Sequence, residues 1–338
     1  MKRPPKRSDA DGSEILCLIP ARNEEANLAE LIPLLKAQGA RVAVFDDESS
    51  DRSADVAGAT GATVVLPREP LPEGWTGKNR ACHELALWAE TTDARLWLFL
   101  DADVRPKPGF LDGMADLAIH ARVVTGIPRI LPGKGAEPLF MAWVGWIILV
   151  SNPFWIVALT GLSHNRFLNG QVTLWHRDTY KKLRPNEAVR GRIMEDVMMG
   201  RLLAREHVSV TVANLSRVLD VRMYENWRQT LDGFSKNSYE MTNSVTGTIL
   251  VALALFVVAW AWVLSPWAAV AFFASGLFVG LLARTAIWPV VLLPLALTIG
   301  SFTCLRSLWW RKTGRTAWKG RIYPSAETRN PKPKRQNR

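Results

Sequence analysis

The chain has 338 residues, enough for one large domain or two ordinary ones, and its formal net charge at pH 7 is +11. Much of the positive charge lies near the two ends, and no basic motif interleaved with aromatic residues accompanies it. We therefore expect anionic lipid, and no nucleic acid, as the charged partner. The three cysteines lack the spacing of metal ligands, which predicts unpaired buried thiols in a reducing compartment.

Segments typical of strands alternate with segments typical of helices over the first 100 residues. In the first helical segment, Leu28, Leu31 and Leu35 share one face. Strands that alternate with helices predict an α/β fold with a mostly parallel sheet. The predicted strands cover residues 15–19, 41–45, 63–66 and 96–100, and the predicted helices cover residues 24–38, 53–59 and 79–90.

Polar side chains follow three of these strands, at the end where parallel sheets bind ligands. The apolar strand 96–100 ends in Asp101 and Asp103, whose carboxylates suit Mg²⁺ or Mn²⁺. The other two clusters are Pro20–Glu25 and Asp46–Asp51. A single Asp-X-Asp is common as a solvated turn. Three strand ends that bring polar groups to one rim predict a binding site.

The segment Gly74–Lys78 places flexible backbone and a cation just before a predicted helix. A helix N-terminus with a nearby lysine suits an anion such as a phosphate group. The segment lacks the glycine spacing of a Walker A motif, so we do not expect a P-loop.

The C-terminal part of the chain is almost free of charged residues between positions 247 and 308. Its three apolar runs, Thr248–Leu264, Trp267–Leu282 and Ile287–Trp310, each approach the roughly 20 residues that cross a bilayer. Their tryptophans suit an interfacial aromatic belt. We expect transmembrane helices over residues 244–310 and a basic tail over residues 311–338.

The first 13 residues form a basic tail with no hydrophobic segment behind it, so no signal peptide is expected. We therefore predict a multi-pass protein of the inner (cytoplasmic) membrane whose N-terminal domain faces the cytoplasm. If the basic tail also faces the cytoplasm, the number of crossings is even. One of the three runs is then re-entrant or interfacial; otherwise the tail lies outside.

A fourth apolar run, Leu139–Leu162, is rich in tryptophan and is broken by Ser151-Asn152-Pro153. It has the composition of a membrane span, but it lies inside the series of polar motifs. An interfacial helix pair at the bilayer surface fits its position better.

Six segments in this order resemble the family 2 glycosyltransferases. They are IPARNEEANL, VFDDESSDRS, GWTGKNRACHELA, LFLDADV, NGQVTLWHRDTY and MEDVMMGRLL. The resemblance covers roughly residues 14–240 and implies a GT-A catalytic domain over residues 14–243 with the interfacial insert 139–162. The segments WRQTLDGFSKN and WKGRIY resemble the membrane-anchored branch that acts on carotenoid acids, hopanoids or ceramide.

The resemblance implies a nucleotide-sugar donor, a UDP-sugar, together with Mg²⁺ or Mn²⁺ and a lipid acceptor that the interfacial run 139–162 guides from the bilayer. Asp103 then coordinates the metal, with Asp101 close to it or to the ribose. Asp46 and Asp47 are placed to accept hydrogen bonds from a uracil-type base and the ribose. The donor-binding residues implied in this way are Pro20, Asn23, Glu24, Asp46, Asp47, Lys78 and Asp101.

Asp196 matches the base of the family, flanked by Glu195, and Gly170 and Gln171 are expected on the acceptor side. One carboxylate in the base position, without a nucleophile on the other face, predicts a single displacement with inversion. Trp227 and Arg228 are also assigned to the acceptor side, although the order Asn-Trp-Arg-Gln departs from the Gln/Arg-X-X-Arg-Trp motif of related enzymes. This departure argues against a processive polysaccharide synthase.

Two other functions fit the same sequence. A polyprenyl-phosphate glycosyltransferase shares the motif series but usually has a different membrane region. An inactive membrane scaffold would be expected to lack Asp103 or Asp196, and both are present. His83 and His176 lie near the motifs, but a lone histidine is more often structural.

Overall fold

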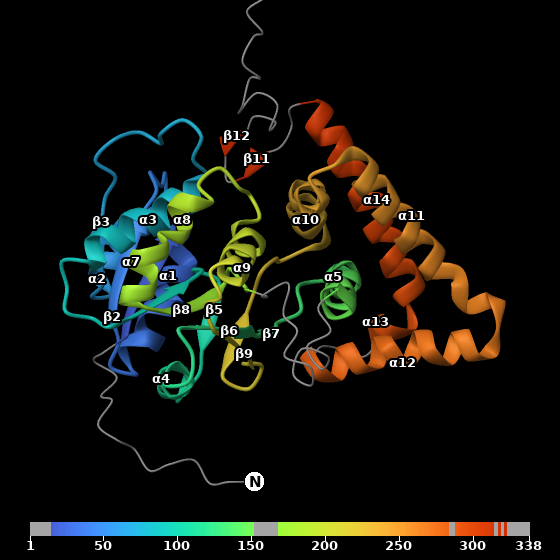
Figure 1. The fold of residues 1–338 in the computed structure, drawn as a ribbon, viewed down its shortest axis with the longest axis horizontal. Coiled ribbons are helices and arrows are strands. Elements are labelled where there is room, and N and C mark those ends of the chain that lie inside the picture. Colours follow the sequence, from blue (N-terminus) through green and yellow to red (C-terminus); the bar gives the residue numbers. More distant parts are fainter. Residues whose placement is uncertain (1–14, 152–167, 284–287, 314–316, 319–320, 323–338) are drawn as a thin grey trace, which may run out of the picture. The chain divides into compact units, whose positions relative to one another are not determined.

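The computed structural model describes residues 15–151, 168–283, 288–313, 317–318 and 321–322 (Figure 1). Contacts divide the chain into two compact units, which are described separately. The first unit is Met1–Leu131 with Trp155–Met223, and the second is Pro132–Phe154 with Tyr224–Arg338. The domain boundaries expected from the sequence remain predictions, and the contacts group residues 224–243 with the C-terminal helices.

The first unit contains a seven-stranded sheet in which one strand runs against the others. β1 pairs in parallel with β2 and β4, β2 with β3, and β6 with β9, whereas β8 is antiparallel to both β4 and β6. The predicted mostly parallel sheet is confirmed. In spatial order the strands are β3 (Thr63–Val65), β2 (Arg41–Asp46), β1 (Ile15–Ala21), β4 (Leu96–Leu100), β8 (Val172–His176), β6 (Val123–Ile127) and β9 (Val210–Asn214).

Helices cover both faces of this sheet, which explains why the neighbouring strands β1 and β4 are apolar at every position. In β4, Leu98 belongs to the core that contains α1, and Trp97 belongs to the core that contains α3. Both side chains are fully buried. The helices of this unit are α1 (Glu25–Lys36), α2 (Ser53–Ala59), α3 (Gly77–Ala89), α4 (Phe110–Ala118), α7 (Arg177–Leu183), α8 (Pro185–Ala188) and α9 (Glu195–Arg205).

The four strands and three helices expected in the first 100 residues are all present, and each end agrees with its predicted position within two residues. The third helix begins at Gly77, two residues before its predicted start at Asn79. Thr76 explains this difference because its hydroxyl accepts a hydrogen bond from the backbone of Asn79 at 3.3 Å and so caps the helix.

The chain enters a second, smaller sheet just after the end of β4. It contains β5 (Val104–Pro106), β10 (Leu219–Val221) and β7 (Arg129–Ile130), in the order β5-β10-β7. The backbone N–H of Arg222 donates to the carbonyl of Asp103 at 3.0 Å. The chain that carries Asp103 is therefore held by backbone pairing just after the main sheet ends.

The second unit is helical, and α14 is its most buried helix. The side chains of α5, α11, α12 and α14 share one apolar core. Figure 1 shows α14 beside α11, its main packing partner. The elements are α5 (Glu137–Ser151), α10 (Trp227–Thr242), α11 (Val245–Ala261), the 3₁₀ turn Trp262–Leu264, α12 (Pro266–Ala283), α13 (Trp288–Val291), α14 (Leu293–Lys312), β11 (Ala317–Trp318) and β12 (Arg321–Ile322).

By length and composition, one helix among the described residues could cross a membrane, namely Val245–Leu264. Glu137–Ile148 and Pro266–Leu281 are apolar but shorter. Several transmembrane helices therefore remain a prediction. Of the predicted interfacial run, α5 contains residues 139–151, and residues 152–162 lie outside the described part of the chain.

The third apolar run forms a helix with polar partners along its C-terminal half. Arg306 of α14 donates to the Asp232 carboxylate at 2.7 Å and to the Ser235 hydroxyl at 3.0 Å, both on α10. The Ser307 hydroxyl accepts from the backbone of Tyr239 at 3.0 Å. Hydropathy alone therefore overstated the apolar character of this run.

We expect Trp97→Ala to lower the free energy of unfolding by about 3–5 kcal/mol, because it empties a fully buried site between β4 and the helices. Trp97 also loses its hydrogen bond to the carbonyl of Ala94, which is 3.2 Å long. Urea unfolding of the detergent-solubilised protein, followed by circular dichroism, measures the change. The control is Leu66→Ala, at a side chain that is 60% exposed, with an expected change within about 0.5 kcal/mol. Equal effects of the two substitutions would contradict the assigned burial.

Candidate functional site

The three polar strand ends expected to form a site do meet at one edge of the sheet. β1 lies between β2 and β4, and all three strands are parallel, so their carboxyl ends point the same way. The loops after β1 and β2 are tied together. The backbone N–H of Asn23 donates to the Ser49 hydroxyl at 2.9 Å, and the Asn23 side chain accepts from the backbone of Ser50 at 2.8 Å. Asn23 has a φ of 53°, a conformation that asparagine tolerates better than most residues.

Asp46 and Asp47 are buried at the end of β2, with 6% and 4% of their surface exposed. One carboxylate oxygen of Asp46 accepts from the backbone of Ser49 at 3.2 Å. The other, Oδ1, is buried and has no hydrogen-bond partner among the described residues. A buried carboxylate oxygen without a donor is costly. A ligand N–H or O–H at this position would remove that cost.

Two further residues that the sequence predicts to bind the donor, Pro20 and Glu24, contact other residues of the first unit. Pro20 lies in β1, opposite Phe45 of β2. Glu24 precedes α1. Its side chain accepts from the Asn27 side chain at 2.6 Å, and its backbone N–H donates to the Ser53 hydroxyl at 2.8 Å. Both residues therefore shape the loop after β1.

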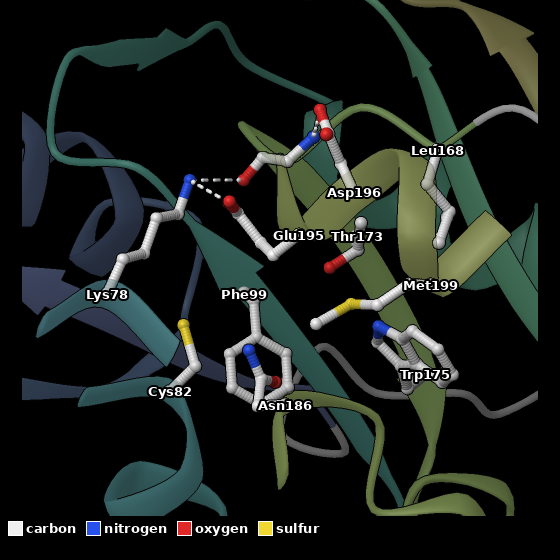
Figure 2. A pocket seen from close by; sticks show the side chains of 11 residues that line it. Lys78, Cys82, Phe99, Leu168, Thr173, Trp175, Asn186, Glu195, Asp196 and Met199 are labelled. Carbon is white, nitrogen blue, oxygen red and sulfur yellow. Dashed lines mark hydrogen bonds and ion pairs between the residues drawn. The ribbon is translucent and has the colours of Figure 1, made fainter. Parts of the chain in front are cut away.

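Lys78, at the start of α3, joins three parts of the first unit (Figure 2). Its Nζ lies 2.7 Å from Asp101 after β4 and 3.0 Å from Glu195 at the start of α9. It also donates to the carbonyl of Gly170, just before β8, at 3.1 Å. Burial alone disfavours the ammonium, but the charges of Asp101 and Glu195 outweigh it and raise the pKa of Lys78 well above its usual value. The lysine therefore remains charged and offsets one of the two negative charges beside it.

Asp196 lies beside this ion-pair cluster, in the first turn of α9. Its Oδ2 accepts from the backbone of Gly170 at 3.3 Å, and its Oδ1 accepts from the backbone of Val197 at 2.8 Å. Burial, and next the negative charge of Glu195, raise the pKa of Asp196 to about 6. A carboxyl group with a pKa near neutrality can take up and release a proton under physiological conditions.

A pocket opens between these groups and the apolar core, and Figure 2 shows Lys78 and Asp196 at its rim. Gln171, which precedes β8, accepts from the backbone of Asp101 at 3.1 Å through its carbonyl. The segment before β8, predicted to lie on the acceptor side, and the end of β4 are therefore in direct contact. The pocket is lined by Lys78, Cys82, Phe99, Leu168, Gly170, Thr173, Trp175, Asn186, Glu195, Asp196 and Met199.

Among the described residues, no group of three or more His, Cys, Asp or Glu side chains is arranged to hold a metal. Asp101 and Asp103 stand one residue apart after β4, and an ion such as Mg²⁺ can take one or two protein carboxylates and complete its shell with substrate phosphates and water. Both carboxylate oxygens of Asp101 approach Lys78, at 2.7 and 2.9 Å. The assignment of Asp103 as the direct ligand stays a prediction.

Trp227 and Arg228 begin α10 in the second unit, so they are not among the residues of the site described in the first unit. The Arg228 guanidinium lies 5.2 Å from the Trp227 ring, which lies 5.5 Å from Phe140 of α5. The two histidines have structural contacts. His83 lies 5.1 Å from the Trp75 ring, and His176 contacts the carbonyl of Ala118 at 2.9 Å.

Comparison with known proteins accounts for this arrangement. Residues 17–152 match the family model Glycosyl transferase family 2. The chain is 26% identical over 261 residues to 4,4'-diaponeurosporenoate glycosyltransferase of Staphylococcus haemolyticus, covering 75% of this chain and 68% of the relative. The chain is a glycosyltransferase with a family 2 domain over residues 17–152. The protein of the same name from Staphylococcus aureus strain USA300 is 26% identical over 249 residues, covering 71% of this chain and 64% of the relative. The chain thus spans about two thirds of these relatives.

Among solved structures, glucosyl-3-phosphoglycerate synthase of Mycobacterium tuberculosis, in complex with Mn²⁺, UDP and glucosyl-3-phosphoglycerate, is similar with a TM-score of 0.45 and 17% identity. The match covers 70% of this glycosyltransferase and 84% of that chain. A likeness of this degree carries no inference about the ligands of the present chain.

The sequence pattern did not identify the buried amides behind the site of this glycosyltransferase. Asn79 and Asn186 are 0% and 4% exposed and hydrogen-bond to each other at 3.0 Å. The available signal was a polar residue within the first turn of a helix, next to Lys78, and that pattern is also typical of a solvated helix start. The burial that distinguishes the two cases depends on the chain around residues 186–192.

We expect Lys78→Met to lower the free energy of unfolding by about 1–3 kcal/mol, because it leaves the Asp101 and Glu195 carboxylates without their cation. The expected loss of stability is modest because about a third of the lysine side chain is exposed to water, which screens its charge. Urea unfolding at pH 7.5 measures it. The matched control is Lys181→Met, which breaks a looser pair with Glu90 at 3.5 Å and should change stability by less than about 0.5 kcal/mol. A Lys78 variant as stable as this control would contradict the importance of the cluster.

Proposed function

We propose that this glycosyltransferase moves a sugar from a nucleotide-sugar donor, a UDP-sugar, to a lipid acceptor in the membrane, with inversion at the sugar carbon. The observation that carries the proposal is the convergence of Lys78, Asp101, Glu195 and Asp196 at the edge of the sheet where the acidic end of β2 also lies. This edge combines buried acceptors for a nucleoside with a carboxylate suited to proton transfer.

On the donor side, Asp46 and Asp47 would accept hydrogen bonds from the base and ribose, in the loop framework that Pro20, Asn23 and Glu24 build. The unpartnered, buried Oδ1 of Asp46 supports this assignment. The donor diphosphate would lie near the N-terminus of α3, where backbone N–H groups and Lys78 favour negative charge.

Asp103 would hold a Mg²⁺ or Mn²⁺ ion together with the donor diphosphate, with Asp101 close by. Such an ion, when bound, offsets the negative charge that the departing diphosphate develops. The oxygen-only chemistry of these two side chains fits either ion. Asp101 is positioned by Lys78, and Asp103 by the backbone bond from Arg222.

Asp196 would act as the base and Glu195 as its positioning neighbour, tied to Lys78. As the acceptor oxygen bonds to the sugar carbon, its proton passes to Asp196, and the bond from that carbon to the diphosphate oxygen breaks. The nucleoside diphosphate leaves from the opposite face, which gives inversion in one step. For a carboxylate acceptor, which has no proton to lose, Asp196 would orient the attacking group.

A lipid acceptor is supported by the two relatives, whose names state glycosyl transfer to diaponeurosporenoate, a carotenoid acid. Within this chain, Gly170 and Gln171 line the acceptor side, and Trp227, Arg228 and the run Leu139–Leu162 would guide the lipid. We propose that α11 anchors the protein in the inner membrane with the catalytic domain on the cytoplasmic side, and that α12 and α14 add to a multi-pass anchor. Large apolar side chains are exposed along α11, such as Leu250, Leu253 and Val257.

We expect cells that make a carotenoid acid and express this chain to accumulate one new glycosylated lipid, and cells with Asp196→Asn to lack it. In membranes that supply a hydroxyl-bearing lipid as acceptor, Asp196→Asn should lower kcat by about 10²–10⁴-fold, the usual range for losing a general base, with donor affinity little changed. Asp178→Asn, at an exposed aspartate on α7, serves as the control. Lipid extraction with mass spectrometry gives the readout. A sugar found on polyprenyl phosphate instead, or full activity of the Asp196 variant, would contradict the proposal.

The pH dependence follows from the raised pKa of Asp196, about 6. With a hydroxyl-bearing lipid as acceptor, the base works only when deprotonated, so kcat/KM should be constant above that pH and should fall about tenfold per pH unit below it. Initial rates between pH 4.5 and 8.5 test this, and the acid limb should be absent from the residual activity of Asp196→Asn. An unchanged acid limb in that variant would assign the titration to another group.

We expect Asp103→Asn to abolish transfer and to remove the dependence of UDP binding on Mn²⁺, because the amide is a poor ligand for a hard cation. Titration calorimetry with UDP, with and without Mn²⁺, measures binding without requiring turnover. Asp112→Asn, at an exposed position on α4, should behave like the unmodified protein. Metal-dependent UDP binding that survives in Asp103→Asn would overturn the ligand assignment.

A further inference from the structure

Asn79 is fully buried in the first turn of α3, immediately after Lys78. Its side-chain nitrogen Nδ2 lies within hydrogen-bond distance of three backbone carbonyls, those of Val189 at 3.1 Å, Arg190 at 3.3 Å and Arg192 at 3.0 Å. It also lies 3.0 Å from the Thr76 hydroxyl. An amide nitrogen carries two hydrogens, so these acceptors share them. One side chain therefore holds the whole turn Val189–Arg192, more than 100 residues away in sequence.

The orientation of the Asn79 amide is set by its other end. Its oxygen accepts from the Asn186 side chain at 3.0 Å, and the Asn186 oxygen accepts from the Tyr180 hydroxyl at 2.5 Å. Burial raises the pKa of Tyr180 well above its usual value, so the hydroxyl keeps its proton and remains a donor. Each member of this chain of hydrogen bonds fixes the direction of the next.

The turn Val189–Arg192 also contacts the segment that precedes α3. The backbone N–H of Thr76 donates to the Arg190 carbonyl at 2.8 Å. At Gly191, an added Cβ would lie 2.9 Å from the carbonyl oxygen of Gly74, closer than such atoms normally approach. The backbones therefore meet here without room for a side chain.

This turn leads directly into α9, which begins at Glu195 and carries Asp196. The first turn of α3 thus holds the base helix through two adjacent residues. Lys78 pairs with Glu195 itself at 3.0 Å, and Asn79 binds the turn before it. Neither contact involves Asp196 directly. Together they determine where its carboxylate lies relative to the Gly-Lys segment.

We propose that Asn79 is a positioning residue for glycosyl transfer, which holds the turn Val189–Arg192 so that Asp196 faces the donor bound at the start of α3. The inference rests on the proposed role of Asp196 as the base. Donor contacts and base geometry then depend on the same helix turn. A displacement of about 1 Å at a reacting group costs on the order of 10²-fold in rate, so the loss of this anchor acts on kcat.

The test compares, in the full-length enzyme, two substitutions that each remove a contact at one end of α3. Asn79→Ala removes the anchor at the first turn. The matched control is Arg177→Met, since Arg177 donates to the carbonyls of Glu90 and Thr92 at 2.9 Å each, at the far end of the helix. Asn79→Ala should lower kcat by about 10–10²-fold, with UDP affinity within about twofold, and it should shift the acid limb of the pH profile. Arg177→Met should lower the melting temperature but leave kcat and the pH profile unchanged.

Gly191→Ala provides a second variant that leaves Asn79 intact, because its added methyl pushes the turn away from Gly74. Gly191→Ala should also lower kcat, and it replaces Asn79→Ala as the test variant if Asn79→Ala does not fold. Unchanged kcat in either folded variant, or an equal loss of kcat in Arg177→Met, would overturn the inference. If Asp196→Asn retained full activity, the proposed base itself would fail, whatever the Asn79 variants show.

Discussion

The ion-pair cluster around Lys78 is the interaction on which the candidate site depends. Two carboxylates, Asp101 and Glu195, lie within 3.0 Å of one ammonium. Carboxylates that are partly removed from water repel each other strongly unless a cation lies between them. With Lys78 in place, the end of β4, the segment before β8 and the start of α9 can meet, and Asp196 is left as the carboxylate with a pKa near 6.

The antiparallel strand β8 explains how residues so distant in sequence reach this edge. In a purely parallel sheet, the carboxyl end of β4 would lie beside the carboxyl end of its neighbour. Because β8 runs the other way, its beginning lies there instead, with Val172 opposite Leu100. Gly170 and Gln171 immediately precede β8, so the Gln171 carbonyl meets the backbone of Asp101 and the Gly170 carbonyl meets Lys78. One reversed strand thereby adds the proposed acceptor-side segment to the proposed donor-binding edge.

The second unit is held together mainly by the packing of α11 against α14. Along α11 the buried positions Thr248, Ala252, Leu255 and Ala259 recur every three or four residues, and larger apolar side chains face outward. A mostly small-residue stripe permits close packing against α14, while the outward face suits lipid. The C-terminal half of α14 instead pairs Arg306 with Asp232 on the polar helix α10. Polar and apolar surfaces therefore alternate along this unit, as at a membrane boundary.

The sequence by itself determined the strands and helices of the first 100 residues, their mostly parallel arrangement and the edge at which polar residues gather. These follow from local periodicity and from strand ends, which are readable over short windows. Only the tertiary structure decided that β8 is antiparallel, that Lys78 pairs with Glu195, that Asn79 is a buried anchor and that α5 and α10 group with the C-terminal helices. Such features depend on contacts between residues about 20 to more than 100 positions apart. Local spacing carries no information about which distant carbonyl or carboxylate a side chain will meet, so burial and partner choice had to come from the packed chain.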